Sequence, residues 1–483
     1  MLRNVFKYLL IFLCYQSVTP VLAQTADEAL IDSLTHNLIP AIVIEGQAET
    51  YDLEERMEHY RVPGVSIAFF EDGVIQWTRC YGVRDVVEGG AVDPNTVFQA
   101  ASISKPVAAA GALVLAEQGL LQLDRDVNAF LNSWSLPSNR FTQNEPVTVR
   151  RLMTHTAGLT VHGFPGYPAY ESAPTVVAVL NGGPGANTDP IVADTIPGSL
   201  WRYSGGGYTV LQQCMSDVTE QSFPALMHKL VLGKLGMERS TYQQPLPPDW
   251  GNVAFAHQSN GGPVTGLFHV YPEMAAAGLW TTPSDLSRFA IAVQNAFHGV
   301  DETLFSQQTA IGMLTPHLGD WGLGPALRVR GDTLAFSHGG SNRGFRCQLF
   351  AFARPITQGI VIMTNGDNGS NLMSEILRSA SRIYGWNMFH PQYKTLHPVA
   401  PGVLADLAGT YSFEQGFVVQ VDLVDDQLRV TQRWNEQTYR ILPTSETTFF
   451  AEHDGTPFVF AKSDEGVMML EIAGQYQGQR NNE

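Results

Sequence analysis

The sequence predicts an α/β fold in which strands from both ends of a large domain share one sheet, followed by a small antiparallel β domain. Three observations predict this fold. Apolar strand patterns occur at residues 64–82 and again at 333–366. Between them, from 120 to 330, helical patterns alternate with loops rich in Gly and Pro. From residue 401 onward, apolar residues alternate with period two around turn signals.

The chain begins with a segment typical of a secretory signal peptide, residues 1–23. Arg3 and Lys7 precede an apolar core, and the segment ends in a small-residue cleavage pattern at Ala23. The apolar stretch Tyr8–Tyr15 is too short to span a bilayer, and no later stretch is long enough, so we expect no stable membrane span. We therefore expect export to the periplasm or the medium.

At 483 residues the chain exceeds the usual single-domain range. We assign residues 24–390 to the large domain and residues 401–483 to the small one. The run "AAAGALVLAEQGLL" is apolar almost all round, which predicts a helix buried between layers. The other expected elements of the large domain are a helical stretch at 27–38, a hairpin at 64–82 with its turn around Glu71, Asp72 and Gly73, strands at 333–340, 345–353 and 358–366, and a closing helix at 371–386.

Charge and cysteine content exclude several function classes. The net charge of −17 would repel nucleic acid phosphates, so we expect no nucleic acid partner. Cys80, Cys214 and Cys347 are widely spaced without a CxxC pattern, which predicts neither a zinc site nor an evident disulfide framework. Free buried thiols are expected, although one pair could bridge in an oxidising compartment. HExxH and similar ligand clusters are missing from the sequence, and we expect no metal or other cofactor.

The stretch "AASISKPVAAAG" begins the buried helix and carries the first candidate site residues. Positions i and i+3 share a helix face, so Ser102 and Lys105 can meet in one cleft while Ser104 points elsewhere. A serine hydroxyl becomes a good nucleophile when a neighbouring base takes its proton, and a buried lysine can act as that base. A helix that begins with serine caps would also explain this stretch. The other motifs are therefore needed to distinguish a catalytic pair from a structural helix start.

Two further stretches complete the set. In "WRYSGGGYTVLQQ", Tyr203 precedes three glycines and a helix, and a nearby ammonium would lower its pKa and allow it to act as a base. In "FSHGGSNRGF", glycine interrupts a strand after His338, as expected where a substrate must approach the backbone closely. Taken singly, each is also compatible with a flexible turn or a β-bulge.

With these motifs in order, residues 53–386 resemble the penicillin-recognising serine hydrolases, which include class C β-lactamases, DD-carboxypeptidases, D-aminopeptidases and esterases. "VPGVSIAFFEDG", "RLMTHTAGLT" and "AAGLWTTPSDLSRF" add to the resemblance. It implies a β-lactamase/transpeptidase-like sandwich, an antiparallel sheet flanked by helices with a helical region beside it. The last segment, 401–483, resembles the lipocalin-like β domains attached to some of these hydrolases.

The resemblance also implies a role for each motif. Ser102 would be the acylated nucleophile, Lys105 its partner, and Tyr203 a base that returns a proton to the leaving group. His338 and Gly340 would border the substrate, and the backbone N–H groups of Ser102 and Ser341 would form the oxyanion hole, as implied by the resemblance. Whether the lysine or the tyrosine is the base stays open.

The sequence departs from the family pattern at two places. Gly205 stands where an asparagine often follows the Tyr-Ser pair, so no amide is available there to hold a peptide-like substrate. His338 replaces the lysine of β-lactamases, so no permanent cation is assured for a β-lactam carboxylate. Arg343 or Arg346 could supply that charge, although structural roles are favoured for both. His155, in "THTAGL", is expected to order a loop and is left out of the catalytic set.

We therefore predict an exported serine hydrolase that cleaves an amide, peptide or ester bond of a small-molecule or peptide substrate through an acyl-serine intermediate. A D-amino-acid peptidase or a carboxylesterase is favoured. The alternatives are a β-lactamase, or a penicillin-binding sensor with little turnover. An α/β-hydrolase is rejected because Gly64-Val65-Ser66-Ile67-Ala68 lacks the last glycine of the GxSxG elbow and lies within a strand pattern.

Overall fold

The computed structural model describes residues 20–481 and forms two compact units. The large unit is Glu54–Met373, and the small unit combines the described residues up to Leu53 with those from Ser374 onward. Most of the predicted signal peptide lies outside the described residues, and helix α1 (Pro20–Thr35) covers its last four positions. The division into domains at 24–390 and 401–483 stays a prediction.

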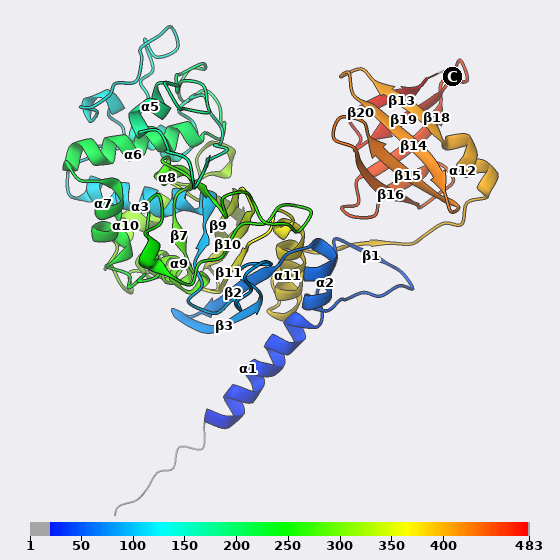
Figure 1. Cartoon of the computed structure of the whole chain (residues 1–483), viewed down its shortest axis with the longest axis horizontal. Helices are drawn as coiled ribbons and strands as arrows, with labels where there is room; N and C mark the ends of the chain where they lie inside the picture. The colour runs from blue at the N-terminus through cyan, green and yellow to red at the C-terminus, as the bar shows by residue number, and fades with distance from the viewer. Residues whose placement is uncertain (1–19, 482–483) are drawn as a thin grey trace, which may run out of the picture. The chain divides into compact units, whose positions relative to one another are not determined.

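A six-stranded antiparallel sheet forms the centre of the large unit, in the order β3-β2-β11-β10-β9-β8 (Figure 1). Strands β2 and β3 come from the start of the unit and pair through β11 with strands from its end, as predicted. The bounds are β2 Gly64–Glu71, β3 Val74–Gly82, β8 Ala326–Arg330, β9 Thr333–Asn342, β10 Phe345–Arg354 and β11 Gly359–Thr364.

The β2–β3 hairpin shows why its turn residues were informative. Glu71 pairs with Val74, and the two residues between them, Asp72 and Gly73, have φ values of 49° and 79°. Two consecutive positive φ angles match the twist of the flanking strands and favour Asp-Gly. The hairpin therefore follows from local sequence alone.

Helices surround this sheet and form a helical region beside it, with α3, α5, α6, α7 and α8 gathered together in Figure 1. Helix α3 is buried from Ser104 to Leu115, as its apolar sequence predicts, and α9 packs against β2 and β11. The helix bounds are α2 Leu53–Tyr60, α3 Ser104–Glu117, α4 Val149–Met153, α5 Val176–Leu180, α6 Gly205–Thr219, α7 Phe223–Met227, α8 Met274–Ala277, α9 Pro283–Phe297, α10 Gln307–Met313 and α11 Gly369–Ile383.

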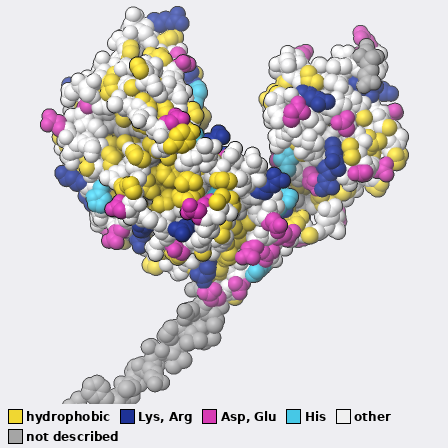
Figure 2. Space-filling model, in the orientation of Figure 1, with side chains coloured by type: hydrophobic (Ala, Val, Ile, Leu, Met, Phe, Trp, Pro, Cys, Tyr) yellow, Lys and Arg dark blue, Asp and Glu magenta, His cyan; other side chains and the backbone are white. Residues whose placement is uncertain are grey.

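Two short strand pairs hold loops of the helical region together. They are β4 Phe98–Gln99 with β7 Trp280–Thr281, and β5 Tyr167–Pro168 with β6 His269–Val270. Figure 2 shows hydrophobic side chains gathered on the surface of the large unit, over the region where the helices meet the sheet. Cys80, Cys214 and Cys347 are free thiols, the last two buried, as the sequence favoured.

The small unit contains a closed eight-stranded antiparallel sheet with consecutive strands paired from β13 to β20. Its core includes Tyr411, Phe449 and Phe460, which are buried inside the closed sheet. The bounds are β13 Gly409–Phe413, β14 Val418–Val424, β15 Gln427–Gln432, β16 Gln437–Pro443, β17 Thr448–Ala451, β18 Pro457–Lys462, β19 Met468–Ile472 and β20 Tyr476–Arg480. The predicted fold class, an α/β sandwich followed by a small antiparallel β portion, is confirmed.

The remaining elements of the small unit bring its two chain segments together. Strand β1 (Ile42–Ile44) pairs in parallel with β12 (Gln392–Lys394), and helix α12 (Pro401–Leu407) precedes the closed sheet. Among residues 20–481, we find no helix with the length and apolar character needed to cross a bilayer.

Candidate active site

Ser102 and Lys105 lie together at the start of the buried helix, as their spacing predicts. Ser102 is in a short 3₁₀ turn, Ala101–Ile103, that leads directly into α3. The Lys105 Nζ atom lies 3.1 Å from Ser102 Oγ and donates to the backbone oxygen of Ala276 at 2.8 Å. The lysine is 2% exposed, whereas Ser102 is half-buried and accessible.

Burial changes the acid–base behaviour of Lys105. Its desolvation lowers its pKa to about 7, and among the described residues no carboxylate forms an ion pair with it. A buried ammonium without a counter-charge is costly, so the neutral amine is favoured. At neutral pH, Lys105 can therefore accept a proton from Ser102.

Ser104 has a structural role, which separates the two serines of the motif. Its hydroxyl donates to the backbone oxygen of Ala101 and accepts from the backbone N–H of Leu279 at 3.0 Å. The side chain is fully buried. Ser104 thus holds the turn that presents Ser102, in agreement with the prediction that it points elsewhere.

Tyr203 lies beside this pair, immediately before helix α6. Ser204 caps that helix by accepting from the backbone N–H of Gly207 at 2.9 Å. The Tyr203 ring centroid is 4.9 Å from Lys105 Nζ. A Cβ on Gly206 would lie 2.6 Å from the backbone oxygen of Thr160, so glycine is needed for the helix to approach that loop.

The predicted lowering of the Tyr203 pKa is wrong. Burial raises the pKa of Tyr203 well above its ordinary value, and a side-chain hydrogen bond with Ser102 opposes only part of that rise. The expected ammonium is itself disfavoured, because Lys105 is buried too. Tyr203 is consequently a protonated phenol, able to donate a hydrogen bond or a proton.

His155, which the sequence analysis left out of the catalytic set, lies within the site. Its Nδ1 accepts from the backbone N–H of Ser204 at 3.1 Å, and its ring centroid is 4.2 Å from that of Tyr203. Burial is the largest cause that lowers the His155 pKa, followed by Lys105. The Nε2 atom is buried without a hydrogen-bond partner among the described residues. A neutral His155 thus holds the segment that carries Tyr203, as its loop-ordering prediction implies.

Strand β9 brings His338, Gly340 and Ser341 to the same place. A Cβ on Gly340 would lie well inside van der Waals contact with the backbone oxygen of Ala100, next to the serine turn. The close approach expected at this glycine is therefore made by the protein's own backbone. Gly340 fixes the distance between β9 and the turn that carries Ser102.

The edge of β9 near Ser341 is not covered by another described strand. Strand β8 pairs with Thr333–Ser337 only. In antiparallel strands, successive residues direct their N–H and C=O groups to alternate sides. Thr333 pairs with Arg330 at the end of the β8–β9 hairpin, so its N–H and C=O groups point towards β8. Ser341 lies an even number of residues further along β9. Its N–H therefore points to the same side of the strand, at the edge that no described strand covers.

His338 does not provide a cation. It is 5% exposed, its Nδ1 is 2.7 Å from the backbone oxygen of Gly339, and burial followed by the nearby Lys105 lowers its pKa to about 3. Of the two arginines considered as substitutes, Arg346 pairs with Asp367 at 3.0 Å. Arg343 is exposed at the end of the hairpin. On strand β9, the position that holds a lysine in β-lactamases is therefore occupied here by the buried His338, whose lowered pKa disfavours a positive charge.

Two tryptophans that sequence reasoning missed form an aromatic wall with the histidines. The ring centroid of Trp321 is 5.0 Å from that of His155 and 5.6 Å from that of His338, and Trp201 packs on Trp321 at 5.3 Å. Trp201 stands two residues before Tyr203, which was the one signal available. Among residues 20–481, no cluster of three His, Cys, Asp or Glu side chains is placed to hold a metal.

The chain is similar in sequence to known proteins over part or most of its length. Protein flp of Staphylococcus aureus (strain N315) is 27% identical over 237 residues, which are 48% of this chain and 44% of that protein. The chain thus spans less than half the length of this relative. Penicillin-binding protein 4* of Bacillus subtilis (strain 168) is 22% identical over 408 residues, 79% of this chain and 86% of that protein.

A solved structure shares the fold over most of the chain. The octameric penicillin-binding protein homologue from Pyrococcus abyssi superposes with a TM-score of 0.60 at 20% identity, covering 89% of this chain and 98% of that one. The family model described as Beta-lactamase matches residues 52–380, about two thirds of the sequence. On this match, the chain belongs to the beta-lactamase family.

Proposed function

We propose that the protein is an exported serine hydrolase that cleaves an amide, peptide or ester bond through a covalent acyl-serine intermediate. The observation that carries the proposal is the buried Lys105 amine, 3.1 Å from the Ser102 hydroxyl and with a pKa lowered to about 7. A nucleophile beside a base that is neutral at working pH is the arrangement that covalent hydrolysis needs.

In the proposed mechanism, Lys105 takes the Ser102 proton as Ser102 Oγ bonds to the substrate carbonyl carbon. The N–H groups of Ser102 and Ser341 stabilise the negative oxygen, and losing one such donor typically costs about 3–4 kcal/mol. The bond to the leaving group then breaks, and Tyr203 donates its phenol proton to that group and is reprotonated by Lys105. Water next attacks the acyl carbon and gives a proton to Lys105. The bond between the acyl carbon and Ser102 Oγ then breaks, Lys105 returns that proton to Ser102 Oγ, and the acid product leaves.

The surroundings favour a D-amino-acid peptidase or a carboxylesterase among these hydrolases. His338 is neutral, Gly205 carries no amide, and the aromatic wall offers apolar contact instead of charge. A β-lactamase, or a penicillin-binding sensor with little turnover, is the second candidate, and exposed Arg343 is the group that would hold the substrate carboxylate. Export is proposed from the pattern of residues 1–23 alone.

Active-site labelling tests this proposal. We expect a fluorophosphonate to label the wild-type protein and Ser259→Ala, whose altered side chain is exposed. Ser102→Ala should not be labelled, and mass spectrometry of the wild type should place the adduct on the peptide that contains Ser102. Undiminished labelling of folded Ser102→Ala would rule out Ser102 as the acylated nucleophile. Rates on p-nitrophenyl esters, D-amino-acid amides and nitrocefin would then rank the substrate classes.

A further inference from the structure

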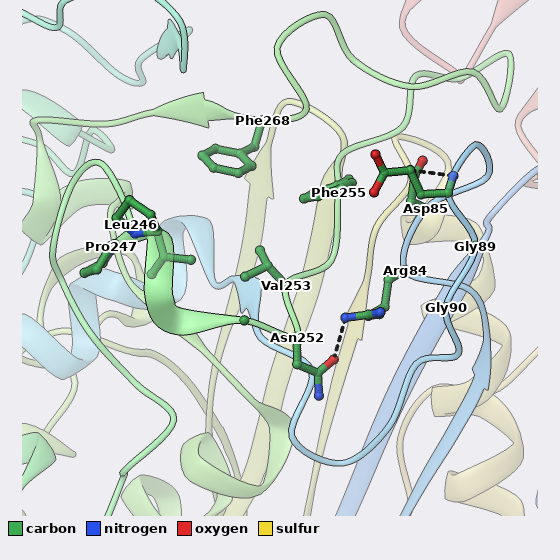
Figure 3. Close-up of a pocket in the computed structure, with 13 residues that line it drawn as sticks. Arg84, Asp85, Gly89, Gly90, Leu246, Pro247, Asn252, Val253, Phe255 and Phe268 are labelled. Atoms are coloured by element: carbon green, nitrogen blue, oxygen red, sulfur yellow. Dashed lines mark hydrogen bonds between the residues drawn. The ribbon is translucent and has the colours of Figure 1, made fainter.

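The large unit contains a pocket of about 370 Å³ that none of Ser102, Lys105 or Tyr203 lines. Its size falls within the range of small-molecule sites. Figure 3 shows Phe255 and Phe268 at the pocket, with Leu246 and Pro247 to one side of them and Arg84 and Asp85 to the other. These apolar walls suit a hydrophobic side chain of modest size.

Arg84 reaches into this pocket with unused hydrogen-bonding capacity (Figure 3). One guanidinium nitrogen, Nη1, donates to Asn252 Oδ1 at 3.3 Å, while Nε is buried without a partner among the described residues. Within that part of the chain, no carboxylate lies within ion-pair distance of Arg84. A guanidinium stays charged and binds carboxylates through two parallel N–H groups, and Nη1 and Nη2 of Arg84 are the nitrogens that a ligand carboxylate would engage.

The position of Arg84 is fixed by its neighbours. Asn252 Oδ1 also accepts from Thr96 Oγ1 at 2.8 Å, and Asn252 Nδ2 donates to Asp93 at 2.8 Å. Gly90, whose φ of 86° favours glycine, lies directly against the guanidinium, where a Cβ would contact Arg84 Nη2. The charge is thus held in place before any ligand arrives.

Two carboxylates at the same pocket, those of Asp85 and Glu88, disfavour a ligand that carries only negative charge. Asp85 is 3% exposed and accepts from the backbone N–H of Glu88 at 2.9 Å, and Glu88 itself is exposed at the pocket. Burial opposes ionisation of Asp85, yet backbone hydrogen bonds outweigh it and lower its pKa, so Asp85 stays charged. These two groups repel an anion and attract an ammonium.

A buried histidine, His257, lies beside Asp85. His257 Nε2 lies 3.8 Å from Asp85 Oδ1, but it accepts from the backbone N–H of Val86 at 3.3 Å. Its Nδ1 is 2.9 Å from the backbone oxygen of Asn365, which must receive the ring proton. Both ring nitrogens of His257 thus face backbone groups, and His257 is not among the residues that line the pocket. The pocket presents one positive group and two negative groups around apolar walls.

We propose that this pocket binds a free amino acid with an apolar side chain, in its zwitterionic form. Arg84 holds the carboxylate, Asp85 and Glu88 hold the ammonium, and the side chain packs against Phe255 and Phe268. The inference is independent of the proposed hydrolase function, because it uses none of the residues of that site.

Calorimetric titration of the full chain with L-leucine and with D-leucine tests the proposal. We expect one of them to bind the wild type, and binding should weaken at least about tenfold in Arg84→Gln. Arg330→Gln, which removes an exposed arginine outside the pocket, should bind like the wild type. N-acetylleucine and leucinamide, which lack the ammonium and the carboxylate respectively, should each bind at least about tenfold more weakly.

A second variant, Val253→Phe, tests the pocket independently of Arg84→Gln. Val253→Phe fills the pocket with apolar volume and leaves every charge in place, so it should also abolish binding while thermal unfolding without ligand shows a folded protein. The proposal is overturned if neither leucine binds the wild type, if folded Arg84→Gln or folded Val253→Phe binds leucine as the wild type does, or if N-acetylleucine binds as tightly as leucine.

Discussion

Burial moves the two ionisable groups nearest Ser102 in opposite directions. It lowers the pKa of Lys105 to about 7 and raises the pKa of Tyr203. Burial disfavours the charged form of each group, which is the protonated form of lysine and the deprotonated form of tyrosine. The same physical cause thus makes the lysine a base and the tyrosine an acid. We therefore propose Lys105 as the base that the sequence left open.

The pH dependence of hydrolysis should show this assignment. Because the proton-accepting form of Lys105 is the neutral one, kcat/KM for p-nitrophenyl acetate should rise as pH increases through about 7 and level off above it. Lys105→Arg, which keeps a permanent charge, should lose about 10²- to 10⁴-fold in kcat/KM. An ascending limb centred near pH 10, close to the ordinary pKa values of both lysine and tyrosine, would contradict this role of Lys105.

His155 is a positioning residue for Tyr203. His155→Phe keeps an aromatic ring but leaves the Ser204 N–H buried without an acceptor, which should cost about 1–3 kcal/mol in the free energy of unfolding. We expect kcat to fall while KM for a small ester changes little, and His155→Asn, which can accept a hydrogen bond, to recover part of the loss. Urea unfolding measures the free energy of unfolding, and steady-state kinetics measure kcat and KM. If neither the free energy of unfolding nor kcat changes in His155→Phe, the positioning role of His155 is refuted.

Local spacing predicted the Ser102–Lys105 pair because three residues along a helix bring side chains to one face. The same reasoning missed the placement of His155 and Trp321, since tertiary packing alone brings them to Tyr203. Burial is also a tertiary property, and for that reason the direction of the Tyr203 pKa could not be read from its motif. Site residues encoded locally were predictable, and those assembled over long sequence distances were not.

At the scale of elements, the spacing between β9 and the serine turn depends on one glycine. Gly340→Ala places a Cβ against the backbone oxygen of Ala100, which cannot move without shifting Ser102. Overpacking of this kind typically costs about 1–3 kcal/mol, and we expect a loss of kcat/KM with it. Differential scanning calorimetry and ester hydrolysis are the measurements.

The neighbouring glycine provides the matched control for stability. A Cβ on Gly339 would meet Gln348 Oε1 at 3.4 Å, an ordinary contact with a flexible side chain. Gly339→Ala should therefore unfold within about 1 kcal/mol of the wild type. Equal destabilisation by the two substitutions would show that strand flexibility, and not contact with Ala100, explains the effect.

For the whole molecule, the sequence predicted the joining of early and late strands into one sheet, because apolar runs of strand length occurred at both ends. It did not predict that an N-terminal segment belongs with the closed sheet. Ile42 and Ile44 pack with Leu442 and Phe450, residues about 400 positions away. No periodic pattern carries that information, since each isoleucine is simply one apolar residue in a short strand.

Removing residues 401–483 tests this organisation. All proposed catalytic residues belong to the large unit, so kcat/KM for p-nitrophenyl acetate should stay within a few-fold of the wild type. Thermal stability should fall, because Ile42 and Ile44 lose the side chains that cover them. Loss of small-ester hydrolysis from a truncated protein that is still folded would give the small unit a part in catalysis.

Closure of the sheet from β13 to β20 has a consequence for association between molecules. An open sheet ends in strands whose unpaired N–H and C=O groups can recruit strands from other chains, which leads to domain swapping or fibril growth. In the closed sheet each strand has a partner on both sides, and β13 pairs with β20 to complete the ring. The closed sheet therefore presents no unpaired strand edge to which a strand of another molecule could add, even at high protein concentration.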